Sequence, residues 1–247
     1  MSGEEAPGSP AGRVVLVTGG SRGIGAACVS WFLAQGDRVA FTSRADQPGP
    51  REDGALALRC DVTVPEQVEA AFAAVEEHFG PVEVLVANAG ITRDTLIARM
   101  SEEAWSEVID TNLTGAYRVA KRAVTKMLRL HRGRVIFISS VGAFVGLPGQ
   151  ANYAASKAGM VGMARALARE VASRSITVNV VAPGLVATDM IEALGTERIE
   201  QMKGLVPLGR TATPDEIADA VGFLASTGAN YITGAVLPVD GGMGMGL

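Results

Sequence analysis

The sequence predicts a doubly wound α/β domain, and three observations support this class. Short apolar segments alternate with helix-like segments along the chain. The apolar segments are rich in Val, Ile and Leu without polar alternation, which is typical of strands buried on both faces of a parallel sheet. A glycine-rich turn follows the first apolar segment, as it does in sheets that bind dinucleotides. The predicted fold is therefore a single Rossmann-type parallel sheet of about seven strands, flanked by helices.

Seven segments are predicted as strands because each is short and mostly apolar, and they span residues 14–17, 38–42, 56–60, 82–87, 134–139, 177–181 and 235–239. Helical patterns lie between them, near residues 24–35, 65–78, 101–130, 151–173 and 214–225. Two of the helices begin with a capping signal: Ser101 precedes two glutamates, and Thr213 precedes Pro-Asp-Glu.

Two stretches lack a clear pattern. Residues 44–55 contain several prolines and glycines, so a loop or one short turn is expected in place of the second crossover helix. Residues 183–207 mix polar residues with Met190, Ile191, Leu194 and Met202. This mixture fits a mobile lid over an apolar substrate, and it fits a pair of ordinary surface helices equally well.

The length of 247 residues, 48% of them hydrophobic, suits one large domain with a substantial core. Residues 1–12 are acidic, rich in Gly and Pro, and lack the pattern of a signal peptide. We therefore expect a disordered tail over 1–12 and one domain over 13–247. No apolar run approaches the ~18 residues of a membrane span, so a cytoplasmic location is expected.

The composition argues against two classes of function. The net charge is -4, whereas a general nucleic-acid-binding protein would carry a basic surplus. The cysteines Cys28 and Cys60 lie apart from each other and from both histidines, His78 and His131. Two buried thiols are the simpler interpretation, and no metal site is predicted.

The glycine-rich turn predicts a phosphate-binding loop. Its glycines allow a tight turn, a close approach to a diphosphate and close packing of helix on strand. The N–H groups at the start of the following helix can then bind the phosphates. A glycine-rich turn without a ligand is the alternative. The expected contacts are Gly19, Ser21, Arg22, Gly23, Ile24 and Gly25.

Charge at the end of the second strand bears on the choice between NADPH and NADH. An NAD site usually places an acid there, but this strand ends in Thr-Ser-Arg44, with Asp37 before it and Asp46 beyond it. Arg22 and Arg44 could bind a 2′-phosphate through charge-assisted hydrogen bonds. We therefore predict NADPH, with two solvated surface arginines as the alternative.

Two further groups follow predicted strands at the edge where ligands bind in open α/β sheets. Asp61 and Val62 follow the third strand, where a carboxylate can meet the exocyclic amine of adenine. Asn88, Ala89 and Gly90 follow the fourth strand. Each group could instead serve as a turn or a helix cap.

Tyr153 and Lys157 stand four residues apart at the start of a predicted helix, so a phenol and an ammonium share one helix face. Ser140 follows a predicted strand, where its hydroxyl can complete an acid site over a carbonyl group. A positive charge ~4 Å from the phenol is worth roughly 4 kcal/mol, so we expect Lys157 to lower the pKa of Tyr153. Alone, each of these residues could have a purely structural role.

Together these elements resemble the short-chain dehydrogenase/reductase family over nearly the whole chain after residue 12. The resemblance is greatest to 3-oxoacyl-[acyl-carrier-protein] reductases of type II fatty-acid synthesis, although a single asparagine, Asn88, replaces the usual pair and the second crossover is short. The segments that carry it are Thr18–Gly25, Asn88–Asp94, Asn112, Ser140, Gly149–Lys157, Thr177–Gly184, Thr188–Met190 and Val239–Met243.

The resemblance implies a mechanism and further contacts. Tyr153 would protonate the keto oxygen, Ser140 would donate a hydrogen bond to it, and Lys157 would also hold the nicotinamide ribose. The backbone of Asn112 would hold a water that relays protons to Lys157. Further cofactor contacts would come from Pro183, Gly184, Val186 and Thr188.

The same resemblance implies an acidic carrier protein as partner and a homotetramer built from the helices of 101–130 and 151–173 and the C-terminal segment. A basic docking patch is expected, with His131, Arg132 and Arg174 as its contacts. A solvated helix face is the alternative. Rival functions are an acetoacetyl-CoA reductase, a polyketide ketoreductase and an inactive NADP-binding regulatory protein.

Overall fold

The computed structural model contains one seven-stranded sheet in which every pairing between neighbouring strands is parallel. It describes residues 12–44, 53–192 and 195–245. The strand order is β3-β2-β1-β4-β5-β6-β7, so the direction of winding reverses between β1 and β4. This confirms the predicted doubly wound sheet. The predicted tail lies outside the described residues except for Gly12, and so does most of the short second crossover.

All seven predicted strands are present, with shifts of one or two residues at their ends. The sheet consists of β1 Val14–Thr18, β2 Arg38–Ser43, β3 Leu56–Arg59, β4 Val84–Ala87, β5 Gly133–Ile138, β6 Ile176–Pro183 and β7 Val236–Val239. The four strands β1, β4, β5 and β6 are almost wholly buried, which explains why they carry apolar residues on both faces.

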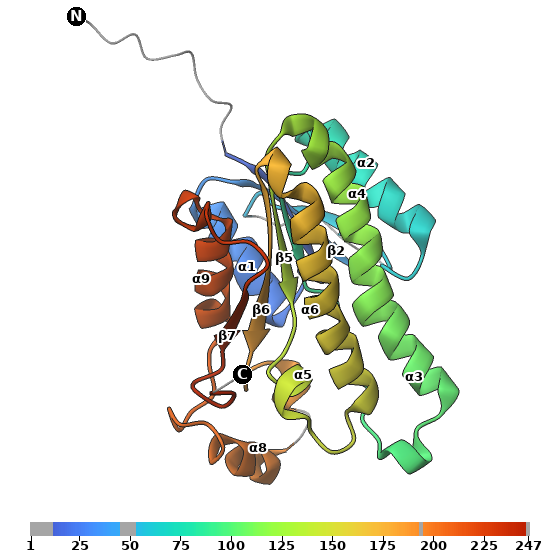
Figure 1. Ribbon diagram of the computed structural model, residues 1–247, viewed down its shortest axis with the longest axis vertical. Helices are drawn as coiled ribbons and strands as arrows, with labels where there is room; N and C mark the ends of the chain where they lie inside the picture. Colours follow the sequence, from blue (N-terminus) through green and yellow to red (C-terminus); the bar gives the residue numbers. More distant parts are fainter. Residues whose placement is uncertain (1–11, 45–52, 193–194, 246–247) are drawn as a thin grey trace, which may run out of the picture.

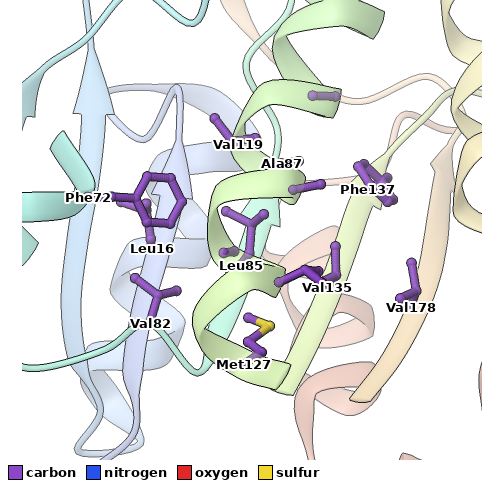
Figure 2. Packing of buried hydrophobic residues seen from close by; sticks show 14 of the residues in the cluster. Leu16, Phe72, Val82, Leu85, Ala87, Val119, Met127, Val135, Phe137 and Val178 are labelled. Carbon is purple, nitrogen blue, oxygen red and sulfur yellow. The ribbon is translucent and has the colours of Figure 1, made fainter. Parts of the chain in front are cut away.

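Helices cover both faces of the sheet. On one face lie α2 Pro65–His78, α4 Gly115–Leu130 and α6 Ala151–Val171, and on the other lie α1 Gly23–Ala34 and α9 Pro214–Ala225 (Figure 1). Figure 2 shows the first core, to which the helices contribute Phe72 and Met127 and the strands contribute Leu16, Leu85 and Phe137. Two apolar layers therefore hold the sheet rigid beneath its loops.

The predicted helix of 101–130 is not continuous. It divides into α3 Glu102–Ile109, a π-helical turn Asp110–Thr114, and α4. In that turn the N–H of Gly115 donates to the carbonyl oxygen of Asp110, five residues back, and the buried Asn112 makes hydrogen bonds outside the helix. A π turn of this kind inserts one residue into a helix and often lies at a functional site.

The stretch of 183–207 contains two short helices, as one of its two interpretations from the sequence expects. It holds α7 Asp189–Glu192 and α8 Thr196–Lys203, with residues 193–194 outside the described part. A short helix that the sequence did not predict, α5 Gly142–Val145, lies between β5 and α6. Both α5 and α8 lie at the carboxyl end of the sheet, where α6 begins (Figure 1). In the described part of the chain, no helix is long and apolar enough to cross a membrane.

Candidate active site

A cleft of about 500 Å³ runs along the carboxyl edge of the sheet, across the point where the direction of winding reverses. This is the place where open α/β sheets bind their ligands. Among the predicted catalytic and cofactor-binding residues, only Asn112 is not part of its wall. The others that line it are Gly19, Ser21, Arg22, Gly23, Ile24, Gly25, Arg44, Asp61, Val62, Asn88, Ala89, Gly90, Ser140, Tyr153, Lys157, Pro183, Gly184, Val186 and Thr188.

The glycine turn between β1 and α1 has no room for side chains at its critical positions. A Cβ at Gly25 would lie 2.1 Å from the carbonyl oxygen of Gly19, and Gly19 and Gly23 both have positive φ. Asn88 braces the turn, because its Nδ2 donates to the carbonyl oxygens of Thr18 and Gly19, each at 3.0 Å. The backbone N–H groups of the turn and of the first turn of α1 are thus presented to the cleft, which fits a diphosphate.

At the end of the cleft next to β3, where the sequence predicts adenine, Asp61 has the structural role of a turn residue that was the alternative to a cofactor contact. Its Oδ1 accepts hydrogen bonds from the backbone N and Oγ1 of Thr63, at 2.9 and 2.7 Å, and so shapes the turn after β3. Asp37 lies away from this end, buried against Arg13 in an ion pair of 2.6 Å. The tip of β2 therefore presents Arg44 to the cleft.

Arg22 and Arg44 are both exposed at the cleft wall. Arg22 makes an ion pair with Asp189 of α7, with 3.3 Å between Nη1 and Oδ2. Both side chains of this pair are more than two-thirds exposed, so water screens it and it contributes little to stability. The guanidinium of Arg22 is therefore available to a stronger anion.

Ser140, Tyr153 and Lys157 come together at the inner end of the cleft. Ser140 follows β5, and Tyr153 and Lys157 lie one turn apart on α6. The Nζ of Lys157 lies 5.6 Å from the centre of the Tyr153 ring and donates to the carbonyl oxygen of Ile138 at 2.7 Å. Burial lowers the pKa of Lys157 to about 8, because a buried ammonium loses its hydration.

The pKa of Tyr153 is shifted in the direction opposite to our expectation. Burial raises it most, the nearby carboxylate of Asp94 raises it further, and the hydrogen bond with the Ser140 hydroxyl lowers it. Desolvation of the phenol, which cannot be read from the spacing of Tyr153 and Lys157, decides the direction of the shift. Tyr153 is thus a neutral phenol at pH 7, which is the form that can donate a proton.

Asn112 is fully buried beneath the cleft. Its Oδ1 accepts from the N–H of Ile91 at 2.8 Å, and its Nδ2 donates to the carbonyl oxygen of Ile91 at 3.0 Å and to Ser156 Oγ at 3.1 Å. A Cβ at Gly90 would lie 3.2 Å from Asn112 Oδ1 and 3.5 Å from Lys157 Nζ. The absence of a side chain at Gly90 thus keeps open the small space that Asn112 and Lys157 share.

Four residues at the substrate end of the cleft were not predicted from the sequence, namely Asp94, Leu147, Gln150 and Met243, whereas Ile191 and Met202 belong to the stretch interpreted as a possible lid. Asp94 and Gln150 are joined by a hydrogen bond of 2.6 Å between Oδ2 and Nε2, and apolar side chains line the same end. The nearness of Gln150 to Tyr153 in the sequence was a usable signal, whereas Asp94 comes close only through folding. The apolar residues at this end are Leu147, Ile191, Met202 and Met243.

The three residues of the predicted docking patch lie at the other edge of the sheet. His131 and Arg132 precede β5 and Arg174 precedes β6, whereas the cleft lies beyond the carboxyl ends of these strands. Arg132 pairs with Glu83 at 2.9 Å, and Arg174 is hydrogen-bonded to His131 at 2.9 Å. The patch of one chain therefore does not adjoin the cleft of the same chain.

Fold and site together define a class of protein. A doubly wound sheet with a glycine turn, whose cleft ends at a serine, a tyrosine and a lysine, is a dinucleotide-dependent oxidoreductase. The chain belongs to the short-chain dehydrogenase/reductase family, whose members use a nicotinamide cofactor. Within the described residues, no group of three or more His, Cys, Asp or Glu side chains could hold a metal ion.

Comparisons with known proteins support this membership. A family model described as Enoyl-(Acyl carrier protein) reductase matches residues 19–244. The chain is 54% identical over 235 residues to the 3-oxoacyl-[acyl-carrier-protein] reductase MabA of Mycobacterium tuberculosis, covering 95% of this chain and 94% of the relative. It is 46% identical over 239 residues to the 3-oxoacyl-[acyl-carrier-protein] reductase FabG of Escherichia coli, covering 95% and 98%.

Proposed function

We propose that the protein is a 3-oxoacyl-[acyl-carrier-protein] reductase that uses NADPH to form (3R)-3-hydroxyacyl-[acyl-carrier-protein] in type II fatty-acid biosynthesis. The observation that carries the proposal is the meeting of Ser140, Tyr153 and Lys157 at the inner end of a dinucleotide cleft. The relatives from M. tuberculosis and E. coli, which carry this activity in their names, match nearly the whole chain. A single domain over 13–247 and a cytoplasmic location belong to the same proposal.

In this reaction NADPH supplies the hydride to the keto carbon. Ser140 donates a hydrogen bond to the keto oxygen as negative charge develops on it. Tyr153, hydrogen-bonded to Ser140 and neutral at pH 7, gives its proton to the same oxygen. The ammonium of Lys157 stabilises the resulting phenolate and binds the nicotinamide ribose. A water held at the turn of Asn112 then returns a proton by way of Lys157.

The family description names an enoyl group, whereas the relatives act on a 3-oxoacyl group. The site favours the oxo substrate. When a ketone is reduced, charge develops on the oxygen of the same carbon that accepts hydride, within reach of two adjacent hydroxyl groups. The donors Ser140 and Tyr153 match that single oxygen.

NADPH is proposed over NADH because the cleft presents Arg22 and Arg44 near its adenine end and, among the residues that the structure describes, no acid at the tip of β2. A 2′-phosphate would replace the weak, exposed partner Asp189 of Arg22. The bound phosphate would then hold both guanidinium groups.

The substrate end of the cleft offers two chemically different walls. Leu147, Ile191 and Met202 form an apolar wall suited to the acyl chain, with Met202 contributed by α8. Asp94 and Gln150 form a polar wall suited to the thioester and the amide-containing arm behind it. We propose that α7 and α8 act as the lid over the acyl chain.

We also propose a homotetramer, and it would resolve the position of the docking patch. Most of the exposed residues along the first four turns of α6 are small, which permits close packing against a second copy, and the exposed charged residues Arg165, Arg169 and Glu170 lie towards its end. Two copies of α6 packed antiparallel about a two-fold axis would bring Arg174 of one chain towards Tyr153 of its partner. The exposed small residues are Ala151, Ala155, Ala158, Gly162 and Ala166.

A steady-state substrate panel tests the proposed function. The 3-oxoacyl group is offered on acyl carrier protein and on CoA, with several chain lengths and with either NADPH or NADH, and an enoyl thioester is included. We expect the highest kcat/KM for the carrier-bound 3-oxoacyl group with NADPH. Equal kcat/KM on CoA would favour an acetoacetyl-CoA reductase, and preference for a polyketide thioester would favour a ketoreductase of that pathway. NADPH binding without turnover of any substrate would favour a regulatory protein.

A further inference from the structure

The adenine end of the cleft rests directly on the start of α4. A Cβ at Gly115 would lie 2.6 Å from Val62 Cγ2 and 3.4 Å from the carbonyl oxygen of Asp110. Only a glycine leaves room for Val62 at this distance. A displacement of Val62 would therefore also displace Gly115, the first residue of α4, because the two are in close contact.

The same residue of α4 ends the π-helical turn Asp110–Thr114. This turn carries Asn112, which fixes Ile91 and Ser156 through three hydrogen bonds. It also carries Thr111, which lines the cleft. The turn thus lies between the adenine end of the cleft and the catalytic end.

Arg118 joins the two sides of this arrangement. Its Nη1 donates to Asp110 Oδ1 at 2.8 Å and to the carbonyl oxygen of Val62 at 3.3 Å. A single nitrogen therefore holds both the turn after β3 and the first residue of the π turn. Arg118 does not line the cleft, and so it can act on a ligand only through the residues that it holds.

The ion pair between Arg118 and Asp110 adds little to stability. The side chains are 22% and 43% exposed, and pairs with this degree of exposure contribute about 1 kcal/mol or less. The position of the guanidinium is therefore its more informative property.

We infer that Arg118 is a positioning residue that couples occupation of the adenine end of the cleft to the geometry of the Asn112 turn. Adenine packed against Val62 fixes the carbonyl group that Arg118 binds. Arg118 in turn holds Asp110, and with it the turn from which Asn112 fixes Ile91 and Ser156. The inference rests on the proposed use of NADPH and extends it to a residue outside the cleft.

The test uses Arg118→Met, which keeps most of the aliphatic stem and removes the guanidinium. Arg122→Met is the matched control, because Arg122 lies one turn further along α4 and its guanidinium contacts α2, through hydrogen bonds to Glu69 and Glu76 and a position 5.2 Å from the centre of the Phe72 ring. We measure the Kd of NADPH by its fluorescence and the Kd of adenosine 2′,5′-bisphosphate by calorimetry, together with kcat and Tm. We expect Arg118→Met to raise the Kd of both ligands about 10-fold and to lower kcat by a similar factor.

Arg122→Met should lower Tm while both Kd values and kcat stay at the wild-type level. A double-mutant cycle with Asp110→Asn completes the test. We expect Asp110→Asn to weaken the binding of adenosine 2′,5′-bisphosphate in the wild-type background and to have no further effect on this binding in Arg118→Met. If Arg118→Met does not fold, the Kd of adenosine 2′,5′-bisphosphate for Asp110→Asn decides the question alone, because this ligand contains the adenine but not the nicotinamide.

The inference is overturned if Arg118→Met behaves like Arg122→Met, with a lower Tm and unchanged Kd and kcat. It is also overturned if the effects of Asp110→Asn and Arg118→Met simply add. A wild-type protein that binds neither NADPH nor the adenine fragment would instead contradict the proposed cofactor, and the two failures are thereby distinguished.

Discussion

Lys157 combines a positive charge with a position from which water is largely excluded. It is buried, its Nζ is hydrogen-bonded to the carbonyl oxygen of Ile138, and burial lowers its pKa to about 8. At neutral pH most of the amine is still charged, so the fold bears the desolvation cost of an ammonium group. We attribute the presence of this buried ammonium group to the need for a positive charge beside Tyr153.

This cost predicts an unusual dependence of stability on pH. Between pH 8 and the unfolded-state pKa of about 10.5, the unfolded chain binds a proton at this lysine that the folded chain has lost, so stability rises with pH. We expect the free energy of unfolding of the cofactor-free wild type, relative to Lys157→Met, to increase by about 2 kcal/mol from pH 8 to pH 10. Urea unfolding at several pH values measures it, and a flat difference would show that the amine keeps its ordinary pKa.

At this scale the sequence predicted which residues meet but not their pKa values. The spacing of Tyr153 and Lys157 on one helix and the place of Ser140 after a strand can be read from the sequence, because both depend on local periodicity. The pKa of Lys157 depends on its burial, and the pKa of Tyr153 depends on burial, on the hydrogen bond with Ser140 and on the charge of Asp94. Those contacts arise only in the folded chain.

The π-helical turn between α3 and α4 illustrates the limit of prediction for whole elements. A continuous helix and a helix with one inserted residue have nearly the same apolar periodicity, so 101–130 was predicted as one helix. The insertion changes the direction of Asn112, which then bonds Ile91 rather than its own helix. By contrast α2 and α9, which begin with proline and carry acidic residues in the first turn, match their predicted bounds.

The glycine turn before α1 offers a test at the level of an element. We expect Gly25→Ala to weaken NADPH binding at least 10-fold, because the new Cβ would collide with the carbonyl oxygen of Gly19 and displace the turn. The free energy of unfolding should fall by about 1–3 kcal/mol. Ser30→Ala, on the exposed side of α1, is the control and should change neither quantity. Wild-type affinity in Gly25→Ala would refute a phosphate role for this turn.

For the whole molecule, the order of strands explains why distant motifs form one site. The groups after β1, β2, β3, β4, β5 and β6 all reach the carboxyl edge because the strands are parallel, so the motifs were predicted to meet there. The docking patch was chosen by its charge alone. Its place at the opposite edge could have been predicted, because His131, Arg132 and Arg174 come directly before predicted strands, and the amino ends of parallel strands lie away from the edge that forms the cleft.

The proposed tetramer accounts for that patch and can be tested directly. We expect light scattering to give four times the mass of one chain. Ala158→Arg, on the exposed side of α6, should reduce the mass because a long charged side chain prevents close packing of two helices. Ser30→Arg on α1 serves as the control and should leave the mass unchanged. A monomer in the wild type would remove the basis for a docking patch shared between chains.

The most direct test of the central claim is a single-turnover experiment. Wild-type protein loaded with NADPH is mixed with 3-oxobutyryl-acyl carrier protein, and both cofactor oxidation and the acyl product are followed. We predict one (3R)-3-hydroxybutyryl group for each NADPH oxidised, and a rate at least about 100-fold lower in Tyr153→Phe, whose NADPH affinity is unchanged. Reduction by Tyr153→Phe at the wild-type rate, or NADPH that stays reduced in the wild type, would contradict the account.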